Sequence, residues 1–477
     1  MSQFLVSAAH KSSGKTTLSI GLCAALHRLG HVVQPFKKGP DYIDPIWLSM
    51  AAGQPCYNLD FQQLTREENS ELFQRLSAPA QVTLVEGNKG LYDGLDIEGS
   101  NSNAAMAQLL GLPVILVIDV RGVTRGVAPL ILGYQAFDRD IRIQGVILNQ
   151  VGGARHEGKL RAIIEHYTDV PVLGAVQHDP ALQIDERHLG LIPGNEADAA
   201  VRQIDYIARS VAAQVDLERL LQVTGGVPAC AGTAAADCVP DAARYQATAV
   251  PRWRIGIVRD RAFGFYYADD LDRLTAAGAT LVEIDALADP ALPELDGLVI
   301  GGGFPELFAR ELEANAPLRA AIRHAIDDGL PVYAECGGLM YLARSLSWRG
   351  ETRQMVGAID GDVVMHERPV GRGYVRLSAT ADSPWPVGAG DIHGHEFHYS
   401  SLENLPADTV YAWRVERGHG IDGRNDGIVH GNLLASYAHL RSSRQFSWVD
   451  AFLQRVMRRA GGDMAGGGGV QSPALAA

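Results

Sequence analysis

Long hydrophobic runs are missing from the sequence. No stretch approaches the roughly eighteen consecutive apolar residues that a membrane-spanning helix requires. The opening segment, MSQFLVSAAHKSSGK, has neither the basic start nor the apolar core and cleavage site of a secretory signal peptide. The sequence therefore predicts a protein that acts in the cytoplasm and has no membrane partner.

Cysteine and positive charge are also scarce. The net charge of −13 argues against a nucleic-acid-binding surface as the main function, although it leaves room for a local basic pocket. The cysteines are odd in number and lack the paired spacing of metal sites, which favours reduced thiols. They are Cys23, Cys56, Cys230, Cys238 and Cys336.

The first half of the chain has the pattern of a parallel α/β sheet. Apolar runs alternate with helix-length segments, and the runs are continuous, as in strands that are covered on both faces. The predicted strands span 4–9, 31–36, 82–87, 113–119, 145–151 and 171–176. We therefore expect a doubly wound α/β domain over residues 1–220.

A second α/β domain is predicted further along the chain. Residues 221–250 are rich in Ala, Gly and small polar residues and are typical of a linker. Strand-like runs resume at 253–258, 280–285, 297–302 and 330–335. We assign 251–459 to this domain and 460–477, which has little apolar content, to a disordered tail.

A phosphate-binding loop follows the first predicted strand. The segment AHKSSGKTT (9–17) fits the phosphate-loop pattern, except that Ala9 replaces its first glycine. Backbone N–H groups there suit phosphate oxygens, Lys15 can reach the terminal phosphates, and Thr16 can ligate Mg²⁺. The predicted ATP-binding residues are Ser13, Gly14, Lys15, Thr16 and Thr17.

Carboxylates follow two further strands, at the sheet edge where open α/β sheets bind ligands. Asp41 and Asp44 lie in KKGPDYIDP (37–45), and Glu86 and Asp93 lie in VTLVEGNKGLYDG (82–94). Beside a triphosphate they would hold Mg²⁺ or position an acceptor. Each alone could instead be a helix cap or a turn residue, and Asp119 has the same ambiguity.

The segment AECGGLMYL (334–342) places a cysteine between a glutamate and two glycines. Small residues after a nucleophile leave space for a substrate, so Cys336 is a candidate nucleophile, although a buried core cysteine fits this stretch equally well. Gly337, together with Gly302 in the glycine run 301–303, could donate backbone N–H groups to an oxyanion. The candidate bases are His393, His395, His398, His430 and His439. A zinc site among the first three is disfavoured, because no Cys or acidic ligand has metal-site spacing.

Taken in order, these motifs resemble those of a known family. GGGFPEL, AECGGLMYL, GHEFHYS and LLASYAHL, behind the phosphate loop and KKGPDYIDP, are similar to the cobyrinic acid a,c-diamide synthases, including those that act on hydrogenobyrinic acid. The resemblance covers roughly residues 4 to 440. It implies an ATP-dependent synthetase domain of the dethiobiotin-synthetase type joined to a class I glutamine amidotransferase domain.

The resemblance also implies roles for individual residues. The glutaminase nucleophile falls on Cys336 and its base on His439, whereas the sequence identifies no acidic third member of a triad. The acidic synthetase residues fall on Asp41 and Glu86, and Tyr42 would contact the acceptor. From the phosphate loop and the strand-end carboxylates, we predict Thr16 and Glu86 as Mg²⁺ ligands. The expected partners are glutamine, ATP and a tetrapyrrole, which is amidated at its a and c acetates. A homodimer remains an open alternative.

Two departures from the family pattern leave the acceptor open. The corrin enzymes commonly have EGVMGL where this chain has Asn88 and Lys89 in EGNKGLYDG. Lys89 could pair with an extra carboxylate of sirohaem or of a sirohydrochlorin derivative, or it could be an exposed lysine without function. Arg441 replaces the second histidine of His-Leu-His and leaves His439 intact. From another class, a nucleotide-dependent ATPase switch with a non-catalytic second domain is the alternative.

Overall fold

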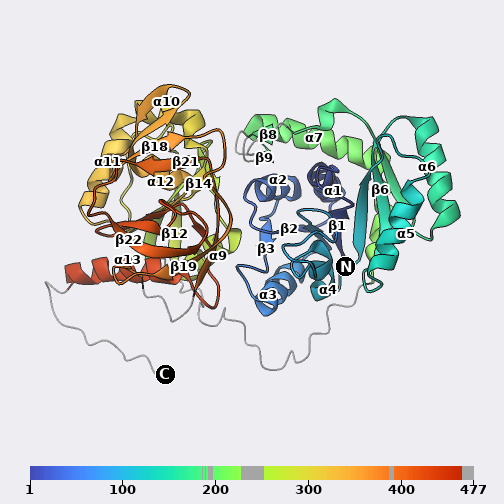
Figure 1. Cartoon of the computed structure of the whole chain (residues 1–477), viewed down its shortest axis with the longest axis horizontal. Helices are drawn as coiled ribbons and strands as arrows, with labels where there is room; N and C mark the ends of the chain where they lie inside the picture. The colour runs from blue at the N-terminus through green and yellow to red at the C-terminus, as the bar shows by residue number, and fades with distance from the viewer. Residues whose placement is uncertain (185, 188–189, 192–196, 227–251, 386–390, 465–477) are drawn as a thin grey trace. The chain divides into compact units, whose positions relative to one another are not determined.

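The computed structural model describes residues 1–184, 186–187, 190–191, 197–226, 252–385 and 391–464. The chain divides into two compact units, Met1–Cys238 and Val239–Ala477, and each is described by itself (Figure 1). None of the helices in the described part of the chain has the length and apolar character that a membrane crossing needs.

The first unit contains a seven-stranded sheet in the order β3-β2-β4-β1-β5-β6-β7, and all of its strand pairs are parallel. Figure 1 shows α1 and α7 on one side of this sheet and α3 and α4 on the other. Its strands are β1 (Ser2–Ala8), β2 (Val33–Lys38), β3 (Tyr57–Leu59), β4 (Val82–Glu86), β5 (Val114–Asp119), β6 (Ile143–Val151) and β7 (Val172–Gln177), and a separate pair is β8 (Glu186–Arg187) with β9 (Gly190–Leu191). The helices are α1 (Lys15–Arg28), α2 (Ile43–Ala52), α3 (Arg66–Ser77), α4 (Asn103–Leu110), α5 (Val127–Phe137), α6 (Ala154–Tyr167), α7 (Ala197–Gln214) and α8 (Leu217–Thr224), with a short 3-10 helix at Pro180–Leu182.

Burial on both faces explains the continuous apolar runs. Every residue of β1 and of β4 is buried, as expected for central strands of a doubly wound sheet. The six strands predicted in this half are present, and the predicted parallel α/β fold is confirmed. The edge strand β3 was not predicted, because three residues are too few to show a periodicity.

The second unit combines parallel and antiparallel pairing in one ten-stranded sheet. The segment β12-β10-β13-β15-β24 is parallel, and it continues as the antiparallel segment β23-β22-β19-β20-β25. The strands of this sheet are β10 (Trp253–Val258), β12 (Ala279–Ile284), β13 (Gly297–Ile300), β15 (Val332–Glu335), β19 (Gly371–Ala379), β20 (Ile392–His398), β22 (Val410–Arg417), β23 (Asn425–His430), β24 (Leu433–Ser436) and β25 (His439–Leu440).

Smaller sheets and the helices complete this unit. A four-stranded sheet has the order β17-β16-β18-β21, and β11 pairs with β14. These strands are β11 (Phe263–Phe265), β14 (Gly302–Gly303), β16 (Ala343–Trp348), β17 (Glu351–Gln354), β18 (Ile359–Met365) and β21 (Ser400–Glu403). The helices are α9 (Ala268–Ala276), α10 (Ala309–Ala314), α11 (Ala316–Asp327), α12 (Gly337–Leu342) and α13 (Trp448–Met464), with a 3-10 helix at Pro305–Phe308. The four strands predicted here are present, and together with β24 they form the parallel part of the large sheet.

The predicted domain boundaries fall near the ends of described segments. Helix α8 continues across residue 220 to Thr224, and α13 continues past the predicted boundary at 459 to Met464. Both helices extend further than their apolar periodicity indicated, since helix ends carry little sequence signal. Most of the predicted linker, from 227 to 250, and the tail from 465 onward lie outside the described residues.

Candidate active sites

The phosphate loop connects β1 to α1 at the carboxyl edge of the first sheet. Gly14 precedes α1 with a φ of 87°, a left-handed conformation that favours glycine. A Cβ at this position would lie 2.2 Å from Asn149 Nδ2, which donates to the Ser13 carbonyl at 2.9 Å. Asn149 is itself buried within β6 and was not among the predicted residues. Its position in the last part of that strand, near the carboxyl edge, was the available signal.

Lys15 is the first residue of α1, and no acidic side chain lies in the first turn of that helix. The free N–H groups of a helix start favour an anion. Burial and the charge of Lys37 together lower the pKa of Lys15 to about 8. The negative charge of a phosphate next to the ammonium group would oppose this lowering, so this end of the helix is suited to a polyphosphate.

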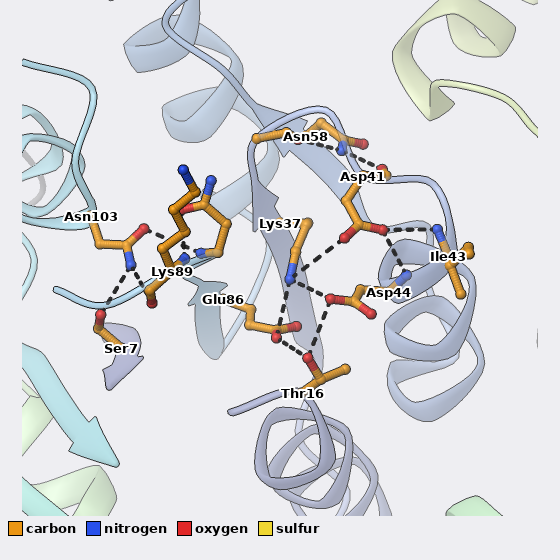
Figure 2. Close-up of polar contacts among 12 residues, drawn as sticks. Ser7, Thr16, Lys37, Asp41, Ile43, Asp44, Asn58, Glu86, Lys89 and Asn103 are labelled. Carbon is orange, nitrogen blue, oxygen red and sulfur yellow. Dashed lines mark hydrogen bonds and ion pairs between the residues drawn. The ribbon is translucent and has the colours of Figure 1, made fainter. Parts of the chain in front are cut away.

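A buried lysine lies at the centre of the neighbouring carboxylate cluster. Lys37, at the end of β2, pairs with Asp44 and with Glu86, whose Oε1 is 3.2 Å from Nζ. Thr16 Oγ1 donates to Glu86 Oε1 at 2.6 Å and to Asp44 Oδ2 at 3.2 Å (Figure 2). Asp41 Oδ2 is 4.0 Å from Lys37 Nζ. The cluster therefore joins the phosphate loop to three of the predicted carboxylates.

Lys37 itself was not predicted as a site residue. It faces Glu86 because β2 and β4 are parallel neighbours with Lys37 in register with Glu86. Burial opposes its charge, but Asp44 and Glu86 outweigh that effect and raise the pKa of Lys37. Burial and the charge of Asp44, partly opposed by Lys37, together raise the pKa of Glu86 to about 7. The lysine is thus charged, and it offsets part of a concentrated negative charge.

The oxygen atoms of this cluster fit a magnesium ion. Glu86 Oε2 is buried and has no hydrogen-bond partner among the described residues. The hydroxyl of Thr16 and the carboxylate of Asp44 lie next to it. Mg²⁺ is commonly held by one or two carboxylates together with substrate phosphates, and no group of three His, Cys, Asp or Glu ligands is present in the described parts of the chain. The site would therefore be completed by a nucleotide.

The remaining predicted residues of this unit have different surroundings. Asp41 accepts hydrogen bonds from the N–H groups of Ile43 and Asp44 at 2.9 and 3.0 Å, at the start of α2, and Tyr42 is the buried residue between them. Asp93 accepts from the Gly90 N–H in a turn. Asp119 pairs with Arg121, and neither it nor Asp93 forms an ion pair with Lys37 in the described residues.

In the second unit, Cys336 occupies a sharp turn between β15 and α12. Its φ of 46° and ψ of −102° are unusual for a residue with a side chain, and its N–H donates to the Ser436 carbonyl at 2.7 Å. The turn is possible because glycines follow it. A Cβ on Gly338 would lie 2.2 Å from the Ile300 carbonyl oxygen, and one on Gly337 would lie 2.8 Å from the Gly303 nitrogen.

A buried histidine and a buried glutamate lie next to this turn. His439 Nδ1 is 3.1 Å from Glu335 Oε2, and the His439 side chain also hydrogen-bonds Cys336. Glu335 Oε1 accepts from the Leu440 N–H at 2.8 Å and from the Tyr333 hydroxyl. Burial lowers the pKa of His439, but the hydrogen bonds to Cys336 and Glu335 outweigh it and raise the pKa to about 10. A protonated imidazole beside a thiol favours the thiolate.

Glu335 is the acidic partner that sequence reasoning did not identify. Its position directly before the cysteine was the available signal, but its contact with His439 depends on the pairing of β15 with β24. The glycine run 301–303 also reaches this site. A Cβ on Gly302 would lie 2.5 Å from His439 Cε1, and Gly303 is the glycine that approaches Gly337.

The other candidate histidines are placed differently. His395 is opposite His439 in the β20–β25 pairing, and burial lowers its pKa to about 3, so it is neutral. His398 stacks on the Tyr437 ring at 3.9 Å between centroids. His393 and His430 are exposed. Arg441, the residue that departs from His-Leu-His, is buried and pairs with Asp269 at 3.0 Å.

Comparisons with known proteins match both units. The profile of an AAA domain matches residues 2–185, and that of a CobB/CobQ-like glutamine amidotransferase domain matches residues 254–445. A cobyrinate a,c-diamide synthase of Magnetococcus marinus is 43% identical over 464 residues, which is 96% of this chain and 98% of that protein. One of Methanosarcina acetivorans is 40% identical over 91% of each chain. The solved structure of PurLQS from Thermotoga maritima aligns with 43% of this chain and 98% of its own at 16% identity, and its TM-score of 0.32 is too low to support a fold assignment.

The contact of Glu335 with His439 predicts the reactivity of Cys336. Iodoacetamide should alkylate Cys336 rapidly at neutral pH, because His439 stays protonated up to about pH 10. Glu335→Gln removes the carboxylate that helps to hold that proton and should slow alkylation at neutral pH roughly ten-fold. The modified peptide can be followed by mass spectrometry, with Cys23 and Cys56 as internal controls, because burial raises the pKa of both thiols. An unchanged rate would contradict this role for Glu335.

The close contact at Gly338 predicts a position-specific loss of stability. In Gly338→Ala the new methyl group would meet the Ile300 carbonyl, and the resulting shift should cost about 1–3 kcal/mol and lower the melting temperature measured by calorimetry. Gly158→Ala, in helix α6, is the matched control because a Cβ there meets nothing within 4 Å. It should be neutral or stabilising by up to about 1 kcal/mol. Equal melting temperatures for the two variants would contradict the prediction.

Proposed function

The chain belongs to the family of cobyrinate a,c-diamide synthases, and we propose that it amidates acetate carboxylates of a tetrapyrrole with ATP and glutamine. The observation that carries the proposal is the Cys336–His439–Glu335 arrangement behind a strained turn, in the same chain as a phosphate loop with its own carboxylate cluster. One unit would release ammonia from glutamine, and the other would activate the acceptor carboxylate.

Ammonia release begins at Cys336. The thiolate attacks the carboxamide carbon of glutamine, and the oxyanion that forms accepts hydrogen bonds from the backbone N–H groups of Gly337 and of Gly302 or its neighbour Gly303. His439 gives its proton to the departing nitrogen, so ammonia leaves and a thioester remains. Water, deprotonated by the now neutral His439, hydrolyses the thioester to glutamate and restores the thiolate. Glu335 orients the imidazole throughout.

Activation of the acceptor takes place at the phosphate loop. An acceptor carboxylate oxygen attacks the γ-phosphorus of ATP, ADP leaves, and an acyl phosphate forms. Ammonia then attacks the acyl carbon, and inorganic phosphate leaves with the amide complete. Lys15 neutralises charge on the transferred phosphoryl group, and Asp41 with Tyr42 positions the acceptor at the start of α2.

Magnesium would be held by Thr16, Glu86 and Asp44, and when bound it supplies positive charge to the phosphate oxygens. Lys37 keeps these carboxylates ordered around the site, because its buried ammonium contacts both Asp44 and Glu86. This arrangement favours a synthetase over an ATPase switch, since a switch would have no use for the nucleophile turn at Cys336.

Sirohaem or a sirohydrochlorin derivative is the second candidate acceptor. The observation that favours it is Lys89, whose side chain is exposed in the loop after β4, within the same segment as Glu86. A cationic residue at this edge of the sheet suits an acceptor that carries an additional ionised carboxylate. Both acceptors would be amidated by the same steps.

The acceptor can be identified by mass spectrometry. Purified protein should be incubated with Mg-ATP, glutamine and, in separate reactions, cobyrinic acid, hydrogenobyrinic acid or sirohaem. The true acceptor should show two successive mass changes, each corresponding to the conversion of one carboxylic acid to an amide. A protein that consumes ATP without forming an amide on any of the three would contradict the proposal and favour the switch.

The two half-reactions should be separable by substitution. Cys336→Ala should abolish amidation with glutamine and preserve it with a high concentration of ammonium salt, because the phosphate loop lies in the other unit. Lys15→Ala should lose amidation with either nitrogen source. Failure of ammonium to rescue a folded Cys336→Ala protein would disprove the two-site scheme.

Among the histidines, His439→Ala should lower glutamate release by roughly 100-fold or more, whereas exposed His393→Ala should retain it.

A further inference from the structure

Lysine is rare in this chain and is confined to the first unit. Of the 42 Lys and Arg residues only six are lysines. One of them, Lys159, is exposed on α6. The other five lie in segments that follow β1, β2 and β4 or end those strands, at the carboxyl edge of the sheet: Lys11, Lys15, Lys37, Lys38 and Lys89. Arginine supplies nearly all other positive charge, so lysine is concentrated at this edge of the sheet.

Lys37 and Lys38 end the same strand and point to opposite faces of the sheet, because successive side chains of a strand alternate. Lys37 lies with the carboxylates of the phosphate-loop face. Lys38 lies on the other face, where its Nζ donates to the carbonyl of Asn101 and approaches Asn88 Oδ1 at 3.4 Å. Its function therefore differs from that of Lys37.

The charge of Lys38 lacks a direct counter-ion. The side chain is buried, yet it forms no ion pair with any residue that the structure describes, and its two hydrogen-bond acceptors are neutral. Burial and the charges of Lys89 and Lys37, partly opposed by the charge of Asp60, together lower the pKa of Lys38 to about 8. A buried ammonium of this kind is costly unless an anion binds beside it.

Asn88 connects Lys38 to Lys89. Its Oδ1 accepts from the Lys89 N–H at 2.8 Å and from Lys38 Nζ, and its Nδ2 would lie 3.1 Å from a Cβ on Gly39. Lys89 is exposed, and its ammonium forms no hydrogen bond or ion pair with another side chain in the described parts of the chain. Asn103 holds the main chain here, donating to the Lys89 carbonyl at 3.2 Å (Figure 2). The loop is thus fixed while the ammonium remains available.

We propose that Lys38, Asn88 and Lys89 form a binding site for a carboxylate of the acceptor other than the one that is phosphorylated. The inference rests on the proposed function and adds the second contact that a substrate with several carboxylates requires. A carboxylate here would neutralise Lys38, separate the two ammonium groups and accept from the Asn88 amide. The three residues position the acceptor and take no part in the chemical steps. They favour an acceptor with an ionised side chain at this edge over one with an apolar edge.

The test compares Lys38→Met, Lys89→Met and Lys89→Arg with the control Lys159→Met, which removes the same charge from exposed α6. Ammonium salt serves as nitrogen source, so the second unit does not contribute. Lys89→Met should raise the KM for the acceptor roughly five-fold, and Lys38→Met should raise it at least as much, with kcat and the KM for ATP unchanged. Lys89→Arg should restore most of the loss, and Lys159→Met should behave as the unsubstituted protein.

Binding without turnover separates this site from the proposed function. Affinity for cobyrinic acid and for sirohaem can be measured by absorbance titration in the absence of ATP, after melting temperatures show that each variant is folded. Weaker binding by the Lys89→Met protein than by the control supports the site even if Lys38→Met fails to fold. Affinities and acceptor KM values within two-fold of the control overturn the site alone. Failure of every tetrapyrrole to bind the unsubstituted protein overturns both proposals.

Discussion

Each candidate active site is built around one buried glutamate at the end of a parallel strand. Glu86 is the last residue of β4, and Glu335 is the last residue of β15. Neither carboxylate can be solvated by water, so each has to be matched by donors from neighbouring segments. Glu86 accepts a hydrogen bond from the hydroxyl of Thr16 in the phosphate loop and pairs with the ammonium of Lys37. Glu335 contacts His439 and accepts hydrogen bonds from the Tyr333 hydroxyl and the Leu440 N–H. The same electrostatic requirement therefore shapes both candidate sites.

The strain at Cys336 follows from the same arrangement. The strand has to stop at Glu335 for its carboxylate to meet His439, and the chain must then reverse within a single residue. The reversal places the helix start against Ile300 and Gly303, at distances that only glycines tolerate. The strained backbone at Cys336 thus reduces local stability, and it fixes the orientation of the Cys336 thiol relative to the His439 imidazole. A nucleophile on a relaxed loop would not keep that angle.

The sequence predicted those parts of the fold and site that depend on local pattern. Continuous apolar runs located the parallel strands, and the loop 9–17 and Glu86 were recognisable because they follow such runs. Lys37 and Glu335 were missed as site residues because their roles depend on pairing between strands distant in sequence. The antiparallel half of the second sheet was not predicted, since its strands are half exposed and carry weaker apolar signals. The positions of strands along the chain were therefore easier to predict than the contacts between residues on neighbouring strands.

The uneven distribution of lysine has a consequence for the handling of the protein. A protease that cuts only after lysine would leave residues 160–477 as one uninterrupted fragment, because the last lysine is Lys159. Amine-directed labels and cross-linkers would likewise attach only to the first unit, at the exposed Met1 and at the exposed lysines, of which Lys11 and Lys89 lie at the carboxyl edge of its sheet. A fluorophore coupled through amines would consequently report in part on that edge, whereas immobilisation through the same chemistry would partly obstruct it.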